Sequence, residues 1–474
     1  MADDVQLVRT VGIVGQGGVG KTSLADALLF AAEVVNRLGR VDDGTSNFDF
    51  EPEEIRRKIS LTTAVFHFPW KKHSIHLLDM PGYSNFLSDT MLCMRACTGI
   101  VYVQAPAAGE IRVEAEKVWN RAAELGLPVV AFVTRMDREN ASFEAALEDM
   151  KKVLGAKPVP LQLPLGQAEG FRGVIDLLSM KALVATETGG HREEPIPADL
   201  VEAAQAARES LIELAADADD PFTETYLENG SLTDEELDQA LRVGTLNRRF
   251  VPVLCGSGSK AIGAAALLDA MARYLGSALE QGTLRGKDPQ LGVEIERRPD
   301  VNEPFSAFVF KTIVDPFAGR LSFLRVVSGK AVPDASVLNT SRDVRERLGH
   351  LLQLNGKKQT AVGAALPGEV VAVAKLKETM TGDTLADEKA PIVYERDQLP
   401  PPAISFAIEP KSRGDEEKAT QALQKMMEED PALELHRDPQ TRELILSGVD
   451  QLHLEVVIER LKRKYGAEVE LKAP

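Results

Sequence analysis

Residues 15–22 read "GQGGVGKT" and determine the fold of the first part of this chain. They match the pattern G-x-x-x-x-G-K-[ST], follow the apolar run "VGIVG", and lead into "TSLADALL", which has helical periodicity. A strand, a glycine-rich turn and a helix N-terminus in that order direct backbone N–H groups at phosphate. The alternative is a glycine-rich turn without a ligand, but both flanks fit the motif. The stretch therefore predicts a nucleotide-phosphate site on an α/β domain.

Two side chains in this loop carry the chemistry. Lys21 is expected to reach the β- and γ-phosphates, and the Thr22 hydroxyl is expected to ligate Mg²⁺. The whole loop is predicted to contact the nucleotide, namely Gly15, Gln16, Gly17, Gly18, Val19, Gly20, Lys21, Thr22 and Ser23.

Length and charge limit the other possibilities. The chain has 474 residues, which suggests about three domains at roughly 150 residues each. Its formal net charge of −17 argues against simple electrostatic binding to RNA, DNA or an anionic membrane, although a local basic face could still dock on a ribonucleoprotein. The N-terminal stretch has no basic, apolar signal region, and no apolar run approaches the ~18 residues that span a bilayer. We expect a cytoplasmic protein with no membrane contact.

The three cysteines agree with that compartment. Cys93, Cys97 and Cys255 are expected to be buried and reduced. Cys93 and Cys97, four residues apart, could instead join a metal site, but no second pair of ligands has suitable spacing.

Residues 1–287 alternate short apolar runs with helical stretches. Five runs read as strands with near-continuous apolar character, which is typical of a parallel sheet covered on both faces: "VRTVGIVG", "HSIHLLDM", "GIVYVQAP", "PVVAFVTRMD" and "FVPVLCGSG". Alternating strands and helices predict an α/β domain. An insertion with helical content interrupts the alternation at about 158–247.

The rest of the chain divides in two. Residues 288–399 have short alternating runs separated by turns, which predict a small β-barrel. Residues 400–474 follow the order strand, helix, strand, strand, helix, strand, the split βαβ (ferredoxin-like) plan. The predicted fold class is thus multidomain α/β plus β: a P-loop domain with a parallel sheet and an inserted subdomain, a β-barrel domain, and a split βαβ α+β domain.

A second group of residues indicates the base. Thr134, Arg135 and Asp137 in "TRMD" match [NT]-K-x-D with arginine for lysine. A carboxylate accepts both the N1–H and the exocyclic amine of guanine, and the arginine stem can cover the base. Ser257 and Gly258 end another strand and suit a backbone N–H directed at guanine O6. Each piece alone could be a polar turn, but the three in order favour guanine over adenine.

With these motifs the sequence resembles the translational GTPases, most closely elongation factor G. The resemblance covers essentially the whole chain, as the first three domains of that family. It is carried by "GQGGVGKT", "DMPGYSNF", "TRMD", "CGSGSKAIGAAALLDAMARYL", "ALQKMMEEDPALEL" and "GVDQLHLEVVIERLKRKYG". It implies binding of GTP and GDP with Mg²⁺, the ribosome as a partner, and GTP hydrolysis. We expect a monomer.

The resemblance also implies roles for single residues. Asp79 and Gly82 match the pair that senses Mg²⁺ and the γ-phosphate, and Asp137 matches the guanine reader. The family's first switch usually reads R-G-I-T, whereas residues 57–60 here read R-K-I-S. Ser60 is the expected Mg²⁺ ligand of this switch, with Thr62 as its competitor. Lysine in place of the glycine makes the conformation of this loop an open question.

Two further departures concern catalysis. The family commonly has aspartate where this chain has Gly18, so an ion bound by that aspartate would be lost here. Its D-x-P-G-H motif uses histidine to orient the attacking water, and here the residue is Tyr83. A tyrosine hydroxyl could hold water by one hydrogen bond but, with a pKa of about 10, does not become a cation. The catalytic set is predicted as Tyr83, Lys21 and Gly82, and the alternative is that Tyr83 only packs.

The predicted function is therefore a translation factor that hydrolyses GTP slowly unless the ribosome activates it. A regulator that acts by GTP occupancy with little hydrolysis is the alternative. Near the end of the chain, the basic residues Arg460, Lys462, Arg463 and Lys464 form either a solvated helix face or a contact to RNA phosphates.

Overall fold

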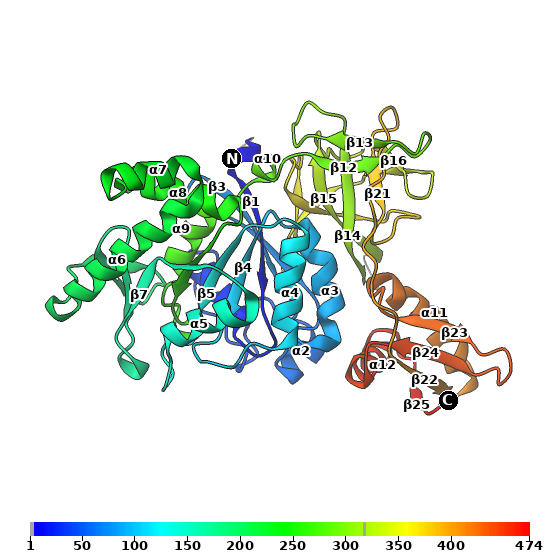
Figure 1. The fold of residues 1–474 in the computed structure, drawn as a ribbon. Helices are drawn as coiled ribbons and strands as arrows, with labels where there is room; N and C mark the ends of the chain where they lie inside the picture. The colour runs from blue at the N-terminus through cyan, green and yellow to red at the C-terminus, as the bar shows by residue number, and fades with distance from the viewer. Residues whose placement is uncertain (1–3, 316–318) are drawn as a thin grey trace. The chain divides into compact units, whose positions relative to one another are not determined.

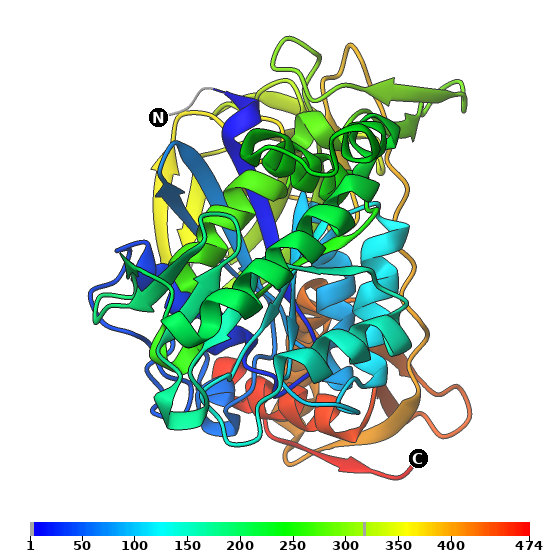
Figure 2. The same cartoon turned by 60° about the vertical axis from the view of Figure 1, so that its left-hand side comes forward.

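The computed structural model describes residues 4–315 and 319–474; residues 1–3 and 316–318, which fall within the predicted first and second domains, lie outside it. The chain forms two compact units. Figures 1 and 2 show the helices and strands that make them up. The first unit comprises Met1–Phe50, Lys58–Tyr83 and Cys97–Gln281. The second comprises Glu51–Arg57, Ser84–Ala96 and Gly282–Pro474.

A seven-stranded sheet forms the centre of the first unit, in the order β2-β3-β1-β4-β5-β11-β6. Every neighbouring pair in it is parallel except β2 and β3, which are antiparallel. The five predicted strands form its interior, so the parallel α/β fold is confirmed. The strands are β1 (Val8–Val14), β2 (Ala64–Trp70), β3 (His73–Asp79), β4 (Gly99–Gln104), β5 (Val129–Val133), β6 (Pro158–Pro160) and β11 (Val251–Cys255).

Helices pack on this sheet through a large apolar core. Leu24 and Leu28 of α1 and Leu267 of α9 are buried with sheet residues in this core. The helices around the sheet are α1 (Lys21–Ala31), α4 (Val113–Glu124), α5 (Phe143–Leu154), α9 (Ala264–Tyr274) and the short α10 (Ala278–Gln281). Cys93, Cys97 and Cys255 are buried and lie outside any disulfide among the described residues, as predicted.

Between β6 and β11 the chain adds both helices and strands. The predicted helical content is present as α6 (Val201–Ala215), α7 (Asp220–Asn229) and α8 (Asp234–Leu246). A four-stranded antiparallel sheet accompanies them in the order β10-β9-β8-β7, and sequence analysis had not identified it. Its strands are β7 (Gln162–Leu165), β8 (Gly173–Asp176), β9 (Lys181–Ala185) and β10 (His191–Glu194).

The second unit contains one large antiparallel sheet. Its order is β17-β16-β21-β14-β15-β20-β18-β19, and it encloses an apolar core that includes Val309, Leu324 and Val371. The strands are β14 (Ser306–Asp315), β15 (Gly319–Ser328), β16 (Ser336–Asn339), β17 (Val344–Arg347), β18 (Leu351–Asn355), β19 (Lys358–Val362), β20 (Val370–Ala374) and β21 (Thr384–Ala386). A small hairpin, β12 (Leu284–Lys287) with β13 (Glu294–Arg297), precedes it.

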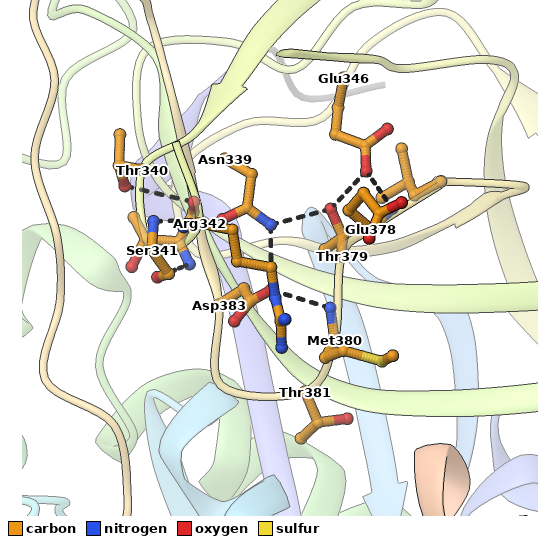
Figure 3. A network of polar contacts seen from close by, with 12 residues as sticks. Asn339, Thr340, Ser341, Arg342, Glu346, Glu378, Thr379, Met380, Thr381 and Asp383 are labelled. Carbon is orange, nitrogen blue, oxygen red and sulfur yellow. Dashed lines mark hydrogen bonds and ion pairs between the residues drawn. The ribbon is translucent and has the colours of Figure 1, made fainter. Parts of the chain in front are cut away.

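A buried polar network fixes one end of this sheet (Figure 3). The Asp383 carboxylate is fully buried and accepts hydrogen bonds from Asn339 Nδ2 (2.9 Å) and Arg342 Nε (2.6 Å). It also accepts from the Met380 backbone N–H (2.9 Å) and pairs with Arg396. These contacts tie the loop before β21 to β16.

Glu346 of β17 completes the same network. It accepts hydrogen bonds from the backbone N–H groups of Lys377 (3.1 Å) and Glu378 (2.8 Å) and from Thr379 Oγ1 (3.0 Å). Its side chain is buried, and every one of these donors belongs to the loop that follows β20. A buried carboxylate with several donors is the usual way to hold such a loop.

The C-terminal part has the predicted strand and helix order. The antiparallel sheet runs β23-β24-β22-β25 and carries two helices, which confirms the split βαβ plan. The elements are β22 (Ile404–Pro410), α11 (Arg413–Glu429), β23 (Glu434–Arg437), β24 (Leu444–Gly448), α12 (Gln451–Tyr465) and β25 (Val469–Lys472).

Two short helices from earlier in the chain belong to this second unit. They are α2 (Pro52–Arg57) and α3 (Leu87–Cys93). Glu53 of α2 is buried and accepts from Arg463 Nε (2.6 Å) and Nη2 (3.0 Å) of α12. On α3, Asp89 accepts from Lys311 Nζ of β14 (2.6 Å).

The basic run on α12 is consequently occupied within the unit. Arg463 also pairs with Glu51 (2.7 Å), Lys462 pairs with Glu468 (3.2 Å), and Lys464 lies 3.8 Å from Glu429. Lys462 and Arg463 are nevertheless exposed, as expected for a solvated helix face, and a contact to RNA phosphates stays a prediction. The carboxylates that pair with Arg463 lie far away in the sequence, so the local pattern did not reveal them. Among the residues that the structure describes, no helix is both long and apolar enough to cross a membrane.

Candidate nucleotide-binding site

The glycine-rich loop joins β1 to α1 and has the backbone that the motif requires. Gly18 (φ 75°) and Gly20 (φ 107°) lie in the left-handed region, which favours glycine. Gly20 is the N-cap of α1, so Lys21 and Thr22 open the helix. Lys21 is buried, and its Nζ donates to the Gln16 carbonyl (2.8 Å).

Gln16 holds this loop to a neighbouring one. Its Nε2 donates to the Glu110 carbonyl (2.7 Å), and its Oε1 accepts from the Arg112 backbone N–H (2.8 Å). The Gln16 side chain, part of the predicted nucleotide-binding loop, therefore holds the phosphate loop to the segment at Glu110 and Arg112.

The three predicted Mg²⁺ ligands lie together. Thr22 Oγ1 donates to Asp79 Oδ2 (2.7 Å) at the end of β3 and lies 2.9 Å from Ser60 Oγ. Ser60 Oγ in turn donates to Asp49 Oδ1 (2.7 Å). Ser60 is therefore the switch hydroxyl that contacts Thr22. Asp49 was not predicted from the sequence.

Asp26 is a second carboxylate that sequence analysis missed. It lies one turn after Thr22 on α1, a spacing that could have identified it. Its Oδ1 accepts from the backbone N–H (2.9 Å) and Nδ2 (2.8 Å) of Asn47 and so fixes the segment that leads to Asp49.

Burial dominates the electrostatics of this cluster. Burial raises the pKa of Asp79 well above its usual range, and the charge of Asp49 adds to the effect, while the Thr22 hydrogen bond and Lys21 oppose it. Burial also raises the pKa of Asp49 to about 6, against the Ser60 hydrogen bond. Burial lowers the pKa of Lys21, although the two carboxylates oppose this. Asp79 and Asp49 therefore hold a proton more tightly, and Lys21 holds one less tightly, than the same groups do in water.

These residues fit a magnesium ion. Asp79 Oδ1 and Asp26 Oδ2 are buried without a hydrogen-bond donor among the described residues. Within that same part of the chain, no group of three or more His, Cys, Asp or Glu side chains is arranged as a metal cage. Mg²⁺ prefers oxygen ligands and usually takes one or two carboxylates together with phosphates of the substrate. Thr22, Ser60 and Asp79 supply that kind of donor set.

The predicted base-binding loops are neighbours at the ends of β5 and β11. The Met136 N–H donates to the Gly256 carbonyl (3.0 Å), which joins the two loops. Asp137 lies 3.6 Å from Lys260 Nζ and is mostly buried. The Ser257 backbone N–H donates a hydrogen bond to the Ile262 carbonyl (2.9 Å), and Gly258 lies against α1. The backbone N–H of Ser257 therefore has a partner within the protein.

Arg135 and Thr134 connect the base loop to the phosphate loop. A Cβ added to Gly20 would lie 3.4 Å from Arg135 Nε and 3.5 Å from Thr134 Cγ2. Arg135 has φ 59°, in the left-handed region, and burial lowers its pKa. Its side chain thus runs along the phosphate loop, in a position where its stem can cover a base.

Gly82 and Tyr83 follow Asp79 and lie against the same loop. A Cβ on Gly82 would lie 2.6 Å from the carbonyl oxygen of Gly15 and the carbonyl carbon of Gln16 and 2.1 Å from Lys21 Nζ, so only glycine fits against the loop and the lysine. The Tyr83 ring lies over Gly17, with its hydroxyl near Gly18. All three predicted catalytic residues are thus at the phosphate loop.

The backbone of Lys58 shows the conformation of the first switch loop with lysine in place of the family's glycine. Its φ is 56°, in the left-handed region that favours glycine, and the family usually has glycine at this position. Such a conformation costs a lysine about 1–2 kcal/mol. The loop keeps the backbone of a glycine in spite of the substitution, and Ser60 still reaches Thr22.

Comparison with protein-family models matches three consecutive parts of the chain. Residues 6–277 match the Elongation factor Tu GTP binding domain, residues 304–388 match Elongation factor G domain 2, and residues 399–473 match Elongation Factor G, domain III. The first match alone covers more than half of the chain.

Whole-chain comparisons give the same family. Elongation factor G of Thermotoga neapolitana is 38% identical over 473 residues, which are 99% of this chain and 68% of that protein. A crystal structure of a protein from Thermus thermophilus matches with a TM-score of 0.87 at 33% identity, again over 99% of this chain and 68% of the other.

Proposed function

Because this chain belongs to the translational GTPases that resemble elongation factor G, we propose that it binds GTP and GDP with Mg²⁺ and hydrolyses GTP slowly unless the ribosome activates it. The observation that carries this proposal is the contact between Thr22, Asp79 and Ser60 beside Lys21. This arrangement places a lysine that can bind phosphates next to oxygen atoms that can bind Mg²⁺.

Each residue has a distinct task in this proposal. Lys21 binds the β- and γ-phosphates, and Thr22, Ser60 and Asp79 would hold Mg²⁺, which neutralises charge on the phosphates when bound. Gly82 leaves room for the lysine, and Tyr83 orients the attacking water through its hydroxyl. Positioning is the main contribution a protein makes to phosphoryl transfer, so a less suitable orienting side chain slows hydrolysis.

The Tyr83 assignment is tested by single-turnover hydrolysis with and without ribosomes. Tyr83→His should accelerate hydrolysis only when ribosomes are present, because the partner is needed to order this side chain. In buffer alone the two proteins should turn over GTP similarly. Rapid hydrolysis by the unmodified protein in buffer, lost in Tyr83→Phe, would show a self-sufficient tyrosine and refute the proposal.

Selectivity for guanine is tested through Asp137. In the proposal its carboxylate accepts two N–H groups of guanine, which adenine does not offer in that arrangement. Asp137→Asn should weaken GTP and favour xanthosine triphosphate, whose base presents an acceptor at that position. Equal affinity of the unmodified protein for ATP and GTP would contradict this assignment.

We also propose the larger organisation and setting. The three family matches support domains at 1–287, with the insertion at about 158–247, at 288–399 and at 400–474. The same kinship supports a cytoplasmic monomer whose partner is the ribosome. Co-sedimentation with ribosomes in the presence of a non-hydrolysable GTP analogue tests the partner.

A further inference from the structure

Two adjacent glycines of the phosphate loop differ in why they lack a side chain. Gly18 has φ 75°, a conformation that favours glycine whatever surrounds it. Gly17 has no such backbone, so an alanine would adopt its conformation without strain. The reason for glycine at position 17 must therefore lie outside its own backbone.

The Tyr83 ring supplies that reason. A Cβ on Gly17 would lie 2.6 Å from Tyr83 Cγ and Cδ1 and 2.7 Å from Cδ2, all far inside van der Waals contact. Three ring atoms at nearly equal distance mean that the face of the ring rests on this Cα. At Gly18 the nearest atom to such a Cβ is the Tyr83 hydroxyl, at 3.2 Å. The ring thus spans both glycines, with its hydroxyl at the second.

The main chain and the flat surface over Gly17 together fix this ring. Tyr83 follows Gly82, which is itself held against Lys21, so the main chain brings the ring to the loop. The side chain is only partly buried, so the surface over Gly17 is a substantial part of its contact area. Tyr83 also lies near enough to Arg135 to raise its pKa against the larger effect of burial.

We infer that Gly17 is a positioning residue for Tyr83, whose ring rests on it and is thereby held with the hydroxyl beside the phosphates. The inference rests on the proposed role of Tyr83 in hydrolysis. A methyl group at position 17 pushes the ring away by about 1 Å, since ordinary carbon contacts lie at about 3.5–4.0 Å. A misplacement of that size at a catalytic group costs about 100-fold in rate.

A double-mutant cycle tests this with single-turnover GTP hydrolysis in the presence of ribosomes. The proteins are the unmodified chain, Gly17→Ala, Tyr83→Ala and the double variant. At saturating GTP, Gly17→Ala should slow hydrolysis about 10- to 100-fold. In the Tyr83→Ala background the same substitution should change the rate less than about twofold. Equal slowing in both backgrounds, or no slowing in either, overturns the inference.

Gly18→Ala is the matched control one residue away. Because its backbone is left-handed, alanine there should lower nucleotide affinity whether residue 83 is tyrosine or alanine. If Gly17→Ala behaves like this control, glycine is needed at position 17 for the loop itself and the inference fails.

A second measurement separates this inference from the proposed function. The six tyrosines are labelled as 3-fluorotyrosine, and the ¹⁹F signal of Tyr83 is the one absent from Tyr83→Phe. Gly17→Ala should shift that signal and leave the other five in place, even if the unmodified protein does not hydrolyse GTP. An unshifted Tyr83 signal overturns the positioning role, whereas absent hydrolysis with a shifted signal overturns the proposed function alone.

Discussion

Buried carboxylates occur in both units of this molecule, but their surroundings are opposite. Beside the eight-stranded sheet, Asp383 is fully buried and its oxygens accept hydrogen bonds from Asn339, Arg342 and Met380 (Figure 3). Arg396 donates a further hydrogen bond to it. At the phosphate loop, Asp79 and Asp26 each keep one buried oxygen without a donor among the described residues. The buried cation beside Asp79 and Asp49 is Lys21.

This difference in hydrogen bonding distinguishes carboxylates that hold the fold together from carboxylates that are suited to binding a ligand. A buried polar group normally has its hydrogen bonds satisfied, because leaving one unmade costs about 1–3 kcal/mol. The Asp383 network meets that rule and holds a loop. The carboxylates of the phosphate loop break it, as expected where a cation and phosphates are to be bound. Substitutions in the two regions should therefore have opposite effects on stability and on binding.

The largest effect is expected from the lysine of the phosphate loop. Lys21→Ala should weaken GTP binding about 1,000-fold, or about 4 kcal/mol, because it removes a charge-assisted contact to two phosphates. The melting temperature of the protein should change little or rise slightly, because a buried charge is lost. Isothermal titration at physiological salt measures the affinity. Unchanged affinity would remove the assignment of the phosphate loop.

The next effect is expected from the satisfied network. Asp383→Ala leaves two arginines without their carboxylate and should lower the free energy of unfolding by about 2–4 kcal/mol. Denaturant unfolding followed by circular dichroism measures it, with GTP affinity expected to be unchanged. Glu395→Ala, at an exposed acid in the same unit, is the control and should change stability by less than about 0.5 kcal/mol.

Asp49 should show the reverse behaviour. Asp49→Asn keeps an acceptor for Ser60 but removes a buried charge, so it should leave stability unchanged or raise it by up to about 1 kcal/mol. Affinity for Mg²⁺, titrated in the presence of GDP, should fall about tenfold. Asp43→Asn, at an exposed acid nearby, should change neither quantity. A marked loss of stability in Asp49→Asn would mean that the two regions do not differ as described.

The pH dependence of Asp49 has a definite sign. Its pKa is about 6 in the folded protein and about 4 in an unfolded chain, so the folded state holds the proton more tightly. Its contribution to stability is therefore present below about pH 4 and is lost as the pH rises to about 6. In the nucleotide-free protein, Asp49→Asn should gain stability relative to the unmodified chain across this window. A difference that shrinks as the pH rises would contradict the burial of this group.

The smallest effect is expected at Lys58. Glycine relieves the left-handed backbone but loses more conformational entropy, so Lys58→Gly should change the free energy of unfolding by less than about 1 kcal/mol. Alanine at the same position keeps the strain and serves as the control. If Lys58→Gly destabilises the protein by more than about 2 kcal/mol, the lysine side chain contributes to the loop in a way that its backbone does not indicate.

Patterns local in the sequence predicted much of this molecule. The interior strands of the parallel sheet have continuous apolar runs, and the C-terminal part has the split βαβ order, so periodicity sufficed for both. The motif predicted the phosphate loop, and Thr22 and Asp79, both predicted as Mg²⁺ ligands, lie in hydrogen-bond contact. The donors and acceptors of those residues lie at strand ends, where a parallel sheet brings distant loops together.

Contacts that depend on side-chain placement were not predictable in this way. Asp49 lies in an irregular segment without periodicity, so nothing indicated that it accepts from Ser60. The contact of the Tyr83 ring with Gly17 depends on a rotamer, and Glu53, one partner of Arg463, lies in an early helix. Such contacts are decided by the folded chain and leave no local pattern.

The ion pairs of α2 and α3 have a consequence for how the chain is made. Asp89 pairs with Lys311, which lies 222 residues later in the sequence, and Glu53 pairs with Arg463, which lies 410 residues later. At a synthesis rate of about 5–20 residues per second, Arg463 is added roughly 20–80 s after Glu53. Until then, α2 lacks the ion pair with α12 that holds it in the finished unit. A nascent chain released early would thus carry Pro52–Arg57 without this ion pair and more open to proteases.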